Sequence, residues 1–293
     1  MQAELPRRDG CPAPWLIRGA EFAWGQRTYL MGILNVTPDS FSDGGKFDSV
    51  ETAVDQALCL TAAGADILDI GGQSTRPQAE DVSLETELAR VIPAVKAIRQ
   101  VCNIPISVDT TKAAVAAAAI AAGADIVNDI SGATYDPEML PVVAELGVPI
   151  ILMHMRGTPQ TMQQMTHYNN LLEDIIAALH TRVIAAQAAG VVLSNIAIDP
   201  GIGFAKAGSQ NVELLRQLSK FHSLGCPILA GPSRKSFIGQ ILNRPDPQDR
   251  VWGTAAACCA AIAGGTDILR VHDVAQMYDV SRVADAIWRT PSV

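Results

Sequence analysis

Gly64-Ala65-Asp66-Ile67-Leu68-Asp69-Ile70 joins the end of a helix-like segment to a short apolar run, and the same junction recurs along the chain. Gly-Ala-Asp returns at residues 123–125, and the related Gly-Thr-Asp stands at residues 265–267, each time before another apolar run. Glycine commonly follows a helix C-terminus, and a short continuous apolar run is typical of a strand buried on both faces. The repeated junction therefore predicts helices that alternate with buried strands.

Working outward from these junctions, we predict eight strands, each followed by a segment with helical periodicity. Short parallel strands with helices between them are covered on both faces, and eight of them can close into a barrel. A doubly wound open sheet is the alternative, but Gly201-Ile202-Gly203 lacks the third glycine of its dinucleotide fingerprint. The sequence therefore predicts an α/β fold, a single (β/α)8 TIM barrel. Its predicted strands are residues 29–34, 67–70, 104–108, 126–128, 150–153, 196–198, 228–230 and 268–271.

The N-terminal part of the chain is predicted to add a short β-hairpin. Its first strand would be residues 17–24, its turn Gly25-Gln26, and its second strand would run from Thr28 into the first barrel strand. We predict that residues 1–14 form a flexible segment and that residues 15–293 form the barrel domain. Among the helices, the clearest patterns are residues 50–63, 84–101, 113–122 and 234–242.

The composition describes an acidic globular protein. Of its 293 residues 48% are hydrophobic, and 30 acidic against 22 basic side chains give a formal net charge of -8. No basic stripe is present to neutralise phosphates, which argues against nucleic-acid binding. The N-terminus lacks the apolar core of a secretory signal, no long window resembles a membrane span, and the six cysteines form no C-x-x-C pair. We therefore expect a cytoplasmic protein with no membrane partner and with reduced cysteines in its core.

Polar residues follow the predicted strands at their C-terminal ends, where a barrel of this kind carries its site. A single Asp such as Asp109 is more often a helix N-cap than a ligand, but a whole ring of polar strand ends is hard to explain by capping. Asp109, Asn128 and Asp199 suit a planar nitrogen heterocycle, and Lys235 can donate to a ring carbonyl. The strand ends therefore predict a site for a small polar molecule.

A second group of strand-end residues can hold an anion. Arg270 and His272 are two residues apart on one predicted strand, so both side chains point the same way and could grip one anion. Alone, they could equally be an arginine paired with a surface carboxylate and a histidine in the core. The turn at residues 231–233 opens a helix after the seventh strand, where barrels often bind phosphate. With Arg76 and Lys235, this group gives an acidic chain a local positive pocket.

The loop after the first barrel strand, residues 35–45, is rich in hydrogen-bond acceptors. Asn35 can supply one oxygen to a magnesium ion held mainly by a substrate phosphate, Phe41 can cover a ligand, and Gly44-Gly45 allows a hinge. The same residue types also make turns for backbone reasons alone, so this loop leaves both interpretations open. The five histidines show no H-E-x-x-H or other dense spacing, so we expect no caged transition metal.

Six motifs in the right order resemble the dihydropteroate synthase family, pterin-binding TIM barrels of folate biosynthesis. Its members are transferases that join 6-hydroxymethyl-7,8-dihydropterin diphosphate to p-aminobenzoate, which gives 7,8-dihydropteroate and diphosphate. Gln73 and Gln78 depart from the pattern, because the family usually has glutamate and glycine at these positions. The resemblance runs from residue 30 to residue 274, with the motifs MGILNVTPDSFSDGG (31–45), DIGGQSTRP (69–77), VNDISG (127–132), DPGIGF (199–204), SRKS (233–236) and RVHD (270–273).

The resemblance implies a role for each candidate residue. The pterin is expected in the barrel mouth, its diphosphate on a cluster of cations with Mg²⁺ as cofactor, and p-aminobenzoate under two closing loops. Asn35 is the expected magnesium ligand, and Ser236 is expected near the aminobenzoate carboxylate. The implied catalytic residues are Asn35, Arg76, Lys235, Arg270 and His272. The implied substrate-binding residues are Thr75, Asp109, Asn128, Asp199, Lys235, Ser236, Phe41, Pro77, Phe204, Asp43, Met153 and Gly231.

The resemblance also implies the partners and leaves two alternatives. The partners are the two small-molecule substrates and, as in the family, a second copy of the chain in a homodimer, for which the Ala-rich segment 255–263 is a candidate packing face. A pterin-binding methyltransferase domain would share the pocket but would not need the loops at residues 35–45 and 74–77. A non-catalytic pterin-binding paralogue is supported only by Gln73 and Gln78.

Overall fold

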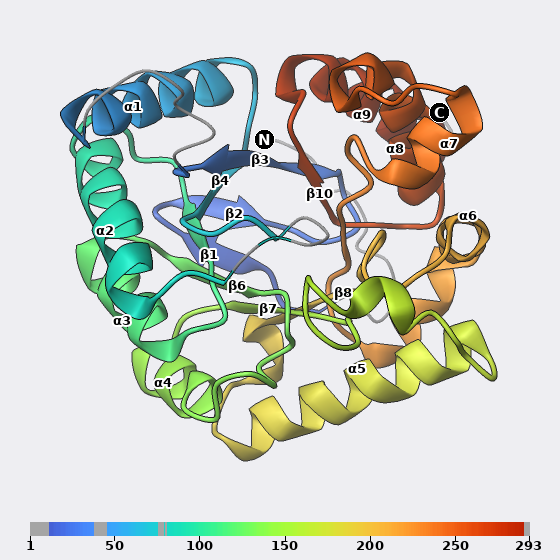
Figure 1. Ribbon diagram of the computed structural model, residues 1–293, viewed down its shortest axis with the longest axis horizontal. Coiled ribbons are helices and arrows are strands. Elements are labelled where there is room, and N and C mark those ends of the chain that lie inside the picture. Colours follow the sequence, from blue (N-terminus) through green and yellow to red (C-terminus); the bar gives the residue numbers. More distant parts are fainter. Residues whose placement is uncertain (1–11, 38–45, 76–78, 80, 290–293) are drawn as a thin grey trace, which may run out of the picture.

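Eight parallel strands form one sheet in the computed structural model, which describes residues 12–37, 46–75, 79 and 81–289. The strands are β3 (Tyr29–Asn35), β4 (Ile67–Gly71), β5 (Ile106–Asp109), β6 (Ile126–Asp129), β7 (Ile150–Met153), β8 (Ile196–Asp199), β9 (Leu229–Ala230) and β10 (Ile268–Val271). Their order is β8-β7-β6-β5-β4-β3-β10-β9, and a parallel bridge between Ile198 and Ile228 connects the two ends. The predicted (β/α)8 barrel is confirmed, and Figure 1 shows its helices as an outer ring around the strands.

The helices follow the strands as predicted. They are α1 (Lys46–Ala62), α2 (Leu84–Val101), α3 (Ala113–Ala122), α4 (Met139–Leu146), α5 (Leu171–Ala188), α6 (Gly208–Arg216), α7 (Ser236–Leu242), α8 (Val251–Ala263) and α9 (Val274–Trp288). Short 3-10 helices are η2 (Met162–Gln164), η3 (Leu193–Asn195), η4 (Leu218–Leu224) and η5 (Pro247–Arg250). The predicted start of α7 at residue 234 was wrong, because Arg234 has a φ of 57°, in the left-handed region, and the helix begins at Ser236.

The repeated Gly-x-Asp junction has two structural roles: its glycine ends a helix and its aspartate accepts a backbone hydrogen bond. Gly64, Gly123 and Gly265 have φ values of 100°, 114° and 86°, which end the preceding helices. The aspartate then accepts a hydrogen bond from a backbone N–H of the previous strand in the sequence. Asp66 does so from Leu30 at 2.8 Å, Asp125 from Ile106 at 2.9 Å, and Asp267 from Ile228 at 3.0 Å. The junction therefore satisfies N–H groups at the N-terminal rim of the barrel.

The predicted N-terminal hairpin is present, but its turn lies elsewhere. Strands β1 (Trp15–Ile17) and β2 (Ala20–Phe22) pair antiparallel around Arg18-Gly19, not around Gly25-Gln26. Arg18 and Gly19 have φ values of 51° and 82°, and two positive φ values suit a two-residue hairpin turn. Residues 1–11 of the predicted flexible segment lie outside the described residues, so that prediction stays open.

The hairpin closes the N-terminal end of the barrel. Trp15, Phe22 and Trp24 are buried in one cluster with the first inward side chains of the strands, such as Met31 and Ile67. Figure 1 shows β1 and β2 lying across the middle of the strand ring. Outward strand residues pack instead against the helices. The N-terminal half of the barrel interior is therefore apolar and filled.

Further along the same strands the inward positions become polar. Asp69 follows Ile67 on β4, Asn128 follows Ile126 on β6, and Arg270 follows Ile268 on β10, each two residues later and so on the same face.

In the described ranges no helix is both long and apolar enough to cross a membrane. The five described cysteines are free thiols, and Cys59 is exposed rather than in the core as predicted.

Candidate active site

A cavity of about 540 Å³ opens at the C-terminal ends of the strands. Its walls come from the end of β3, the loops after β4 and β8, the turn after β9, and β10. Predicted site residues that line it are Asn35, Thr75, Phe204, Gly231, Lys235, Ser236, Arg270 and His272. The structure therefore brings residues from distant parts of the chain together as the strand-end argument predicted.

Arg270 connects three strands inside the barrel. Its Nε donates to Asp69 at 2.6 Å and its Nη2 donates to Asp109 at 2.7 Å, while the amide of Asn128 donates to Asp69 at 3.2 Å. Burial raises the pKa of Asp109 to about 7, although the guanidinium lowers it. Asp109 is no helix N-cap, because Lys112 holds that position in front of α3. Asp109 and Asn128 are paired in register, so a carboxyl and an amide lie side by side.

Asp199 and Lys235 are a second carboxylate and cation of the site, and each charge acts on the other. The carboxylate of Asp199 accepts from the N–H of Gly201 at 2.7 Å, and the ammonium of Lys235 lies 4.0 Å from the centroid of the Phe204 ring. Burial raises the pKa of Asp199 to about 6 and lowers the pKa of Lys235 to about 8, while each charge partly offsets the shift of the other. The pair thus offers a ligand one strong acceptor and one strong donor.

The turn that carries Lys235 is held in its left-handed conformation from several sides. The N–H of Arg234 donates to Thr254 at 3.0 Å, its guanidinium pairs with Asp273 at 3.0 Å, and its carbonyl accepts from Arg250 at 2.8 Å. These contacts offset the cost of a positive φ at a residue with a side chain. They fix the direction in which Lys235 leaves the backbone.

His272 was predicted to supply positive charge, but its surroundings favour the neutral ring. Burial, then the neighbouring cations Arg270 and Arg234, lower its pKa to about 3. Ser233 Oγ accepts from the backbone N–H of His272 at 3.1 Å and lies 2.9 Å from its Nδ1. Either of these two side-chain atoms can be the donor, and when the Ser233 hydroxyl donates to Nδ1, the ring proton is on Nε2. His272 can bind an anion through that N–H rather than through a charge.

Met153 forms part of an apolar wall beside these charges. It is buried in a cluster with Ile130, Met162, Phe204 and Ala205. Four predicted residues, Phe41, Asp43, Arg76 and Pro77, and the departure Gln78 lie outside the described residues. Their roles stay predictions.

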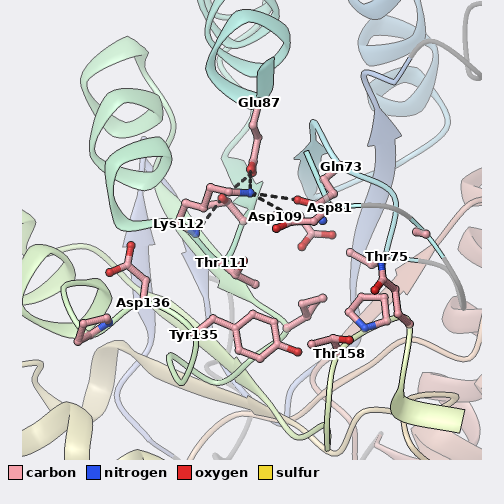
Figure 2. A pocket seen from close by; sticks show the side chains of 16 residues that line it. Gln73, Thr75, Asp81, Glu87, Asp109, Thr111, Lys112, Tyr135, Asp136 and Thr158 are labelled. Carbon is pink, nitrogen blue, oxygen red and sulfur yellow. Dashed lines mark hydrogen bonds and ion pairs between the residues drawn. The ribbon is translucent and has the colours of Figure 1, made fainter. Parts of the chain in front are cut away.

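A second cavity of about 470 Å³ adjoins the first, with Thr75 lining both. Figure 2 shows Lys112 in its wall, directed at Glu87, Gln73 and Asp81. The ammonium lies 2.7 Å from Glu87, 3.2 Å from the Gln73 side-chain oxygen and 3.5 Å from Asp81. The side-chain oxygen of Gln73 therefore accepts a hydrogen bond from the Lys112 ammonium. Gln73 is therefore tied to the start of α3 and, through Glu87, to α2.

Sequence reasoning missed four charged residues of the site: Asp69, Glu87, Lys112 and Lys206. Asp69 carried a usable signal, because a carboxylate on the inward face of an apolar strand demands a partner. Lys206 follows Phe204 by two residues and carried no signal of its own. Its ammonium is buried against His154, as described below.

Asn35 fits the predicted magnesium site. Its side chain is half-buried at the end of β3 and lines the same cavity as Arg270 and His272. A carboxamide oxygen is a hard ligand, and Mg²⁺ commonly takes only one or two protein oxygens when a substrate phosphate supplies others. Among the residues that the structure describes, no group of three or more His, Cys, Asp or Glu side chains could hold a metal. The donor set thus suits an ion held mainly by substrate.

The fold and this donor set define a barrel enzyme for a polar heterocycle with an anionic group, and the comparisons agree. The family model for pterin binding enzymes matches residues 31–272, and the chain belongs to this family. It is similar to the dihydropteroate synthase of Synechocystis sp., with 58% identity over 281 residues that cover 96% of this chain and 97% of that protein.

Two solved structures are similar along almost the whole chain. Dihydropteroate synthase from Xanthomonas albilineans with 4-aminobenzoic acid has 43% identity and a TM-score of 0.88, and the match covers 96% of this chain and 100% of that one. The enzyme of the same organism in complex with 7,8-dihydropteroate has 43% identity and a TM-score of 0.82, with 91% and 96% covered. The resemblance inferred from the motifs is confirmed.

Proposed function

We propose that this chain is a dihydropteroate synthase, a transferase that joins 6-hydroxymethyl-7,8-dihydropterin diphosphate to p-aminobenzoate. The observation that carries the proposal is the arrangement of two acid–base pairs, Arg270 with Asp109 and Lys235 with Asp199, within one barrel mouth. Similar proteins that bear this name match 96% of the chain.

The pterin would bind between Asp109, which pairs with Arg270, and the charged groups of Asp199 and Lys235. Its amino-pyrimidine edge presents N–H donors, which Asp109 and Asp199 can accept, and its ring carbonyl presents an acceptor for Lys235. Asn128 offers both a donor and an acceptor and lies next to Asp109. Met153 and Phe204 supply apolar surface for the ring faces.

The diphosphate would lie toward Asn35, Arg270 and His272, with Arg76 as a further cation. Catalysis would consist mainly of stabilising the negative charge that develops on the leaving group. Bound magnesium would add positive charge at the same oxygens, with Asn35 as its protein ligand. The N–H on Nε2 of His272 would donate to a leaving oxygen.

The bond changes follow from the two substrates. The C–O bond between the pterin methylene and the diphosphate breaks first, with its electron pair leaving on oxygen and a pterin-stabilised cation remaining. The lone pair of the aminobenzoate nitrogen then forms the C–N bond, and that nitrogen releases one proton. The 4-aminobenzoic acid named with the Xanthomonas structure is the same nucleophile. Phe204 and Ser236 line the cavity where it would lie, and Phe41 and Pro77, which are outside the described residues, are proposed to cover it.

A homodimer is proposed through the face formed by α7, α8 and α9, which Figure 1 shows side by side. The predicted Ala-rich segment turns Cys258 and Ile262 into the protomer core, so the exposed side of these helices is the better candidate. That side carries large apolar residues, with Trp252 75% exposed and Ile241 67% exposed. Trp252→Glu should give a monomer in sedimentation, whereas Val192→Glu, on an exposed apolar site elsewhere, should not.

We also propose a cytoplasmic location, where the free thiols stay reduced.

The function is tested by incubating the purified protein with magnesium and both substrates. Diphosphate release that requires p-aminobenzoate and is matched mole for mole by dihydropteroate supports the synthase. A methyltransferase domain or a non-catalytic paralogue would bind pterin without releasing diphosphate.

A further inference from the structure

Lys206, in the loop between β8 and α6, is a lysine with only 3% of its surface exposed. Its Nζ has three acceptors within reach: the Phe204 carbonyl at 2.9 Å, His154 Nδ1 at 3.1 Å and the His154 carbonyl at 3.4 Å. An ammonium has three N–H donors and can satisfy all three, whereas a neutral amine would turn its lone pair toward one of them. The contacts therefore favour the charged form, although burial lowers the pKa of Lys206 to about 7.

His154 is suited to this contact. Burial, followed by the positive charges of Lys206 and Arg156, lowers its pKa to about 2, so the imidazole is neutral. Since its Nδ1 accepts from Lys206, its proton is on Nε2. The lysine thus joins the loop after β8 to the residue that follows β7.

The loop that Lys206 holds has an unfavourable backbone. Gly201, Gly203 and Ala205 have φ values of 74°, 85° and 50°, and Ala205 pays the steric cost that glycine avoids. A Cβ on Gly201 would lie 2.0 Å from the His154 carbonyl oxygen, so the loop packs directly on the end of β7. Besides the Lys206 contacts, the Tyr168 hydroxyl donates to the Ala205 carbonyl at 2.9 Å.

The same loop presents a wall of the substrate cavity. Gly203 and Phe204 line it, and the Lys235 ammonium lies over the Phe204 ring. A Cβ on Gly203 would lie 2.8 Å from the Lys235 side chain, so the loop and this side chain are in close contact. A shift of the loop would therefore move both Phe204 and Lys235.

We propose that Lys206 is a positioning residue for the substrate site, which fixes the loop of residues 201–206 so that Phe204 and Lys235 are in place for the pterin. This inference rests on the proposed synthase function. It predicts an electrostatic effect as well as a geometric one. The cations that face Asp199 are Lys235, Lys206 and Arg270, and each lowers the pKa of that carboxyl. Loss of the Lys206 charge should let the pKa of Asp199 rise.

The test compares Lys206→Met with Lys220→Met in the full chain. The same change at Lys220 removes an exposed lysine of η4 and serves as the control. Lys206→Met should lower kcat/KM for the pterin diphosphate by roughly 10- to 100-fold, the scale of a small misplacement in an active site. Most of the loss should appear in KM. The acidic limb of the kcat/KM profile should move up by about half to one pH unit, because Asp199 loses a neighbouring cation.

Each outcome bears on the proposal. A Lys206→Met enzyme with the kcat/KM and acidic limb of the wild type overturns it, and a loss of kcat/KM without movement of that limb overturns its electrostatic part. If Lys206→Met does not fold, Tyr168→Phe removes only the hydrogen bond from Tyr168 to the same loop. It should cost several-fold in kcat/KM with the acidic limb unmoved, and no cost would reject the positioning role. Should the wild type release no diphosphate, the synthase function fails, and calorimetric pterin affinity in the same variants still decides the role of Lys206.

Discussion

The two ends of the barrel interior are built from opposite kinds of side chain. At the N-terminal end, Phe22 and Trp24 fill the space between apolar inward residues. Two residues further along the strands, the inward positions carry Asp69, Asn128 and Arg270. Burying apolar surface stabilises a fold, whereas burying charge costs stability unless each charge is paired. The comparison indicates that apolar burial at the filled end offsets the free-energy cost of burying charge at the other end, where the substrates are proposed to bind.

The largest effect is expected from Arg270→Ala, which breaks the charged end. It should raise the free-energy barrier that kcat/KM reports by about 2 to 5 kcal/mol, the range for truncating a buried charge-assisted contact. It also leaves Asp69 and Asp109 without their cation, which should lower the free energy of unfolding by roughly 3 to 5 kcal/mol. Steady-state kinetics and urea unfolding measure the two losses.

Lys235→Ala separates those two losses. The barrier that kcat/KM reports should rise over the same range of about 2 to 5 kcal/mol, but the free energy of unfolding should fall by less than in Arg270→Ala, because, among the described residues, two carboxylates pair with Arg270 and none pairs with Lys235. Arg216→Ala, at an exposed position of α6, is the control and should change neither quantity. Near wild-type kcat/KM in the Arg270 or Lys235 variant would show that the assigned site is wrong.

Trp24→Ala breaks the filled end instead. Its ring is buried 4.9 Å from that of Trp15 and 5.7 Å from that of Tyr29, measured between centroids. Removing it should lower the free energy of unfolding by about 3 to 5 kcal/mol, with kcat/KM nearly unchanged well below the melting temperature. Leu16→Ala, which removes a β1 side chain that is 76% exposed, should cost under roughly 0.5 kcal/mol. If Trp24→Ala reduced kcat/KM as strongly as Arg270→Ala, the two ends would not be separable.

The pH dependence of stability measures the cost of the charged end. Burial raises the pKa of Asp109 to about 7 and those of Asp129 and Asp199 to about 6, from an ordinary value of 3.8. Between these values the native carboxyls still hold protons that the unfolded chain has lost. The contribution of these three carboxyls to the free energy of unfolding is therefore fully present below about pH 4. It is lost as pH rises to about 7, by at most about 1.4 kcal/mol per pH unit for each group.

Urea unfolding at about pH 5 and about pH 7 checks this sign. His154 and His272, whose pKa values are lowered, add stability as pH rises through the same window, so the contribution of Asp199 is the difference between the wild type and Asp199→Asn, whose amide does not titrate. Relative to Asp199→Asn, the wild type should lose free energy of unfolding between the two pH values. A wild type that gained stability relative to that variant would contradict the assignment.

The filled end and the barrel were largely predictable from sequence, because their causes are local. The bounds of α2, α3, β7 and β10 match the predictions, and glycine junctions and apolar runs set them. The hairpin turn was misplaced, because a positive φ at Arg18 has no strong sequence signal. The positions of Asp109 and Asn128 at one rim could be predicted, because a barrel collects its strand ends there.

The support for the site was not predictable, because it depends on partners far apart in sequence. Asp69 and Arg270 are separated by 201 positions, His154 and Lys206 by 52, yet each pair is in hydrogen-bond contact. A sequence pattern reports where a strand ends, but not which side chain compensates a buried charge.

The smallest effect is expected at Gln73, the departure that borders the charged end. If the usual glutamate were a general base, its neutral isostere would cost roughly 10²- to 10⁴-fold in rate. A base is not required, because the arylamine is neutral near pH 7 and its lone pair is free to attack, while the barrier lies mainly in diphosphate departure. The Gln73 oxygen instead accepts from Lys112, whose ammonium already pairs with the buried carboxylate of Glu87. In Gln73→Glu a second carboxylate would attract Lys112 but repel Glu87, so the two effects partly cancel.

We therefore expect kcat of Gln73→Glu to differ from that of the wild type by less than about tenfold, or under roughly 1.4 kcal/mol in the barrier. Gln73→Met, which removes the oxygen and keeps the size, is the matched control and should loosen the loop more than Gln73→Glu does, seen as a higher KM. A wild type without activity that Gln73→Glu rescued a hundredfold would refute this account and favour the non-catalytic paralogue.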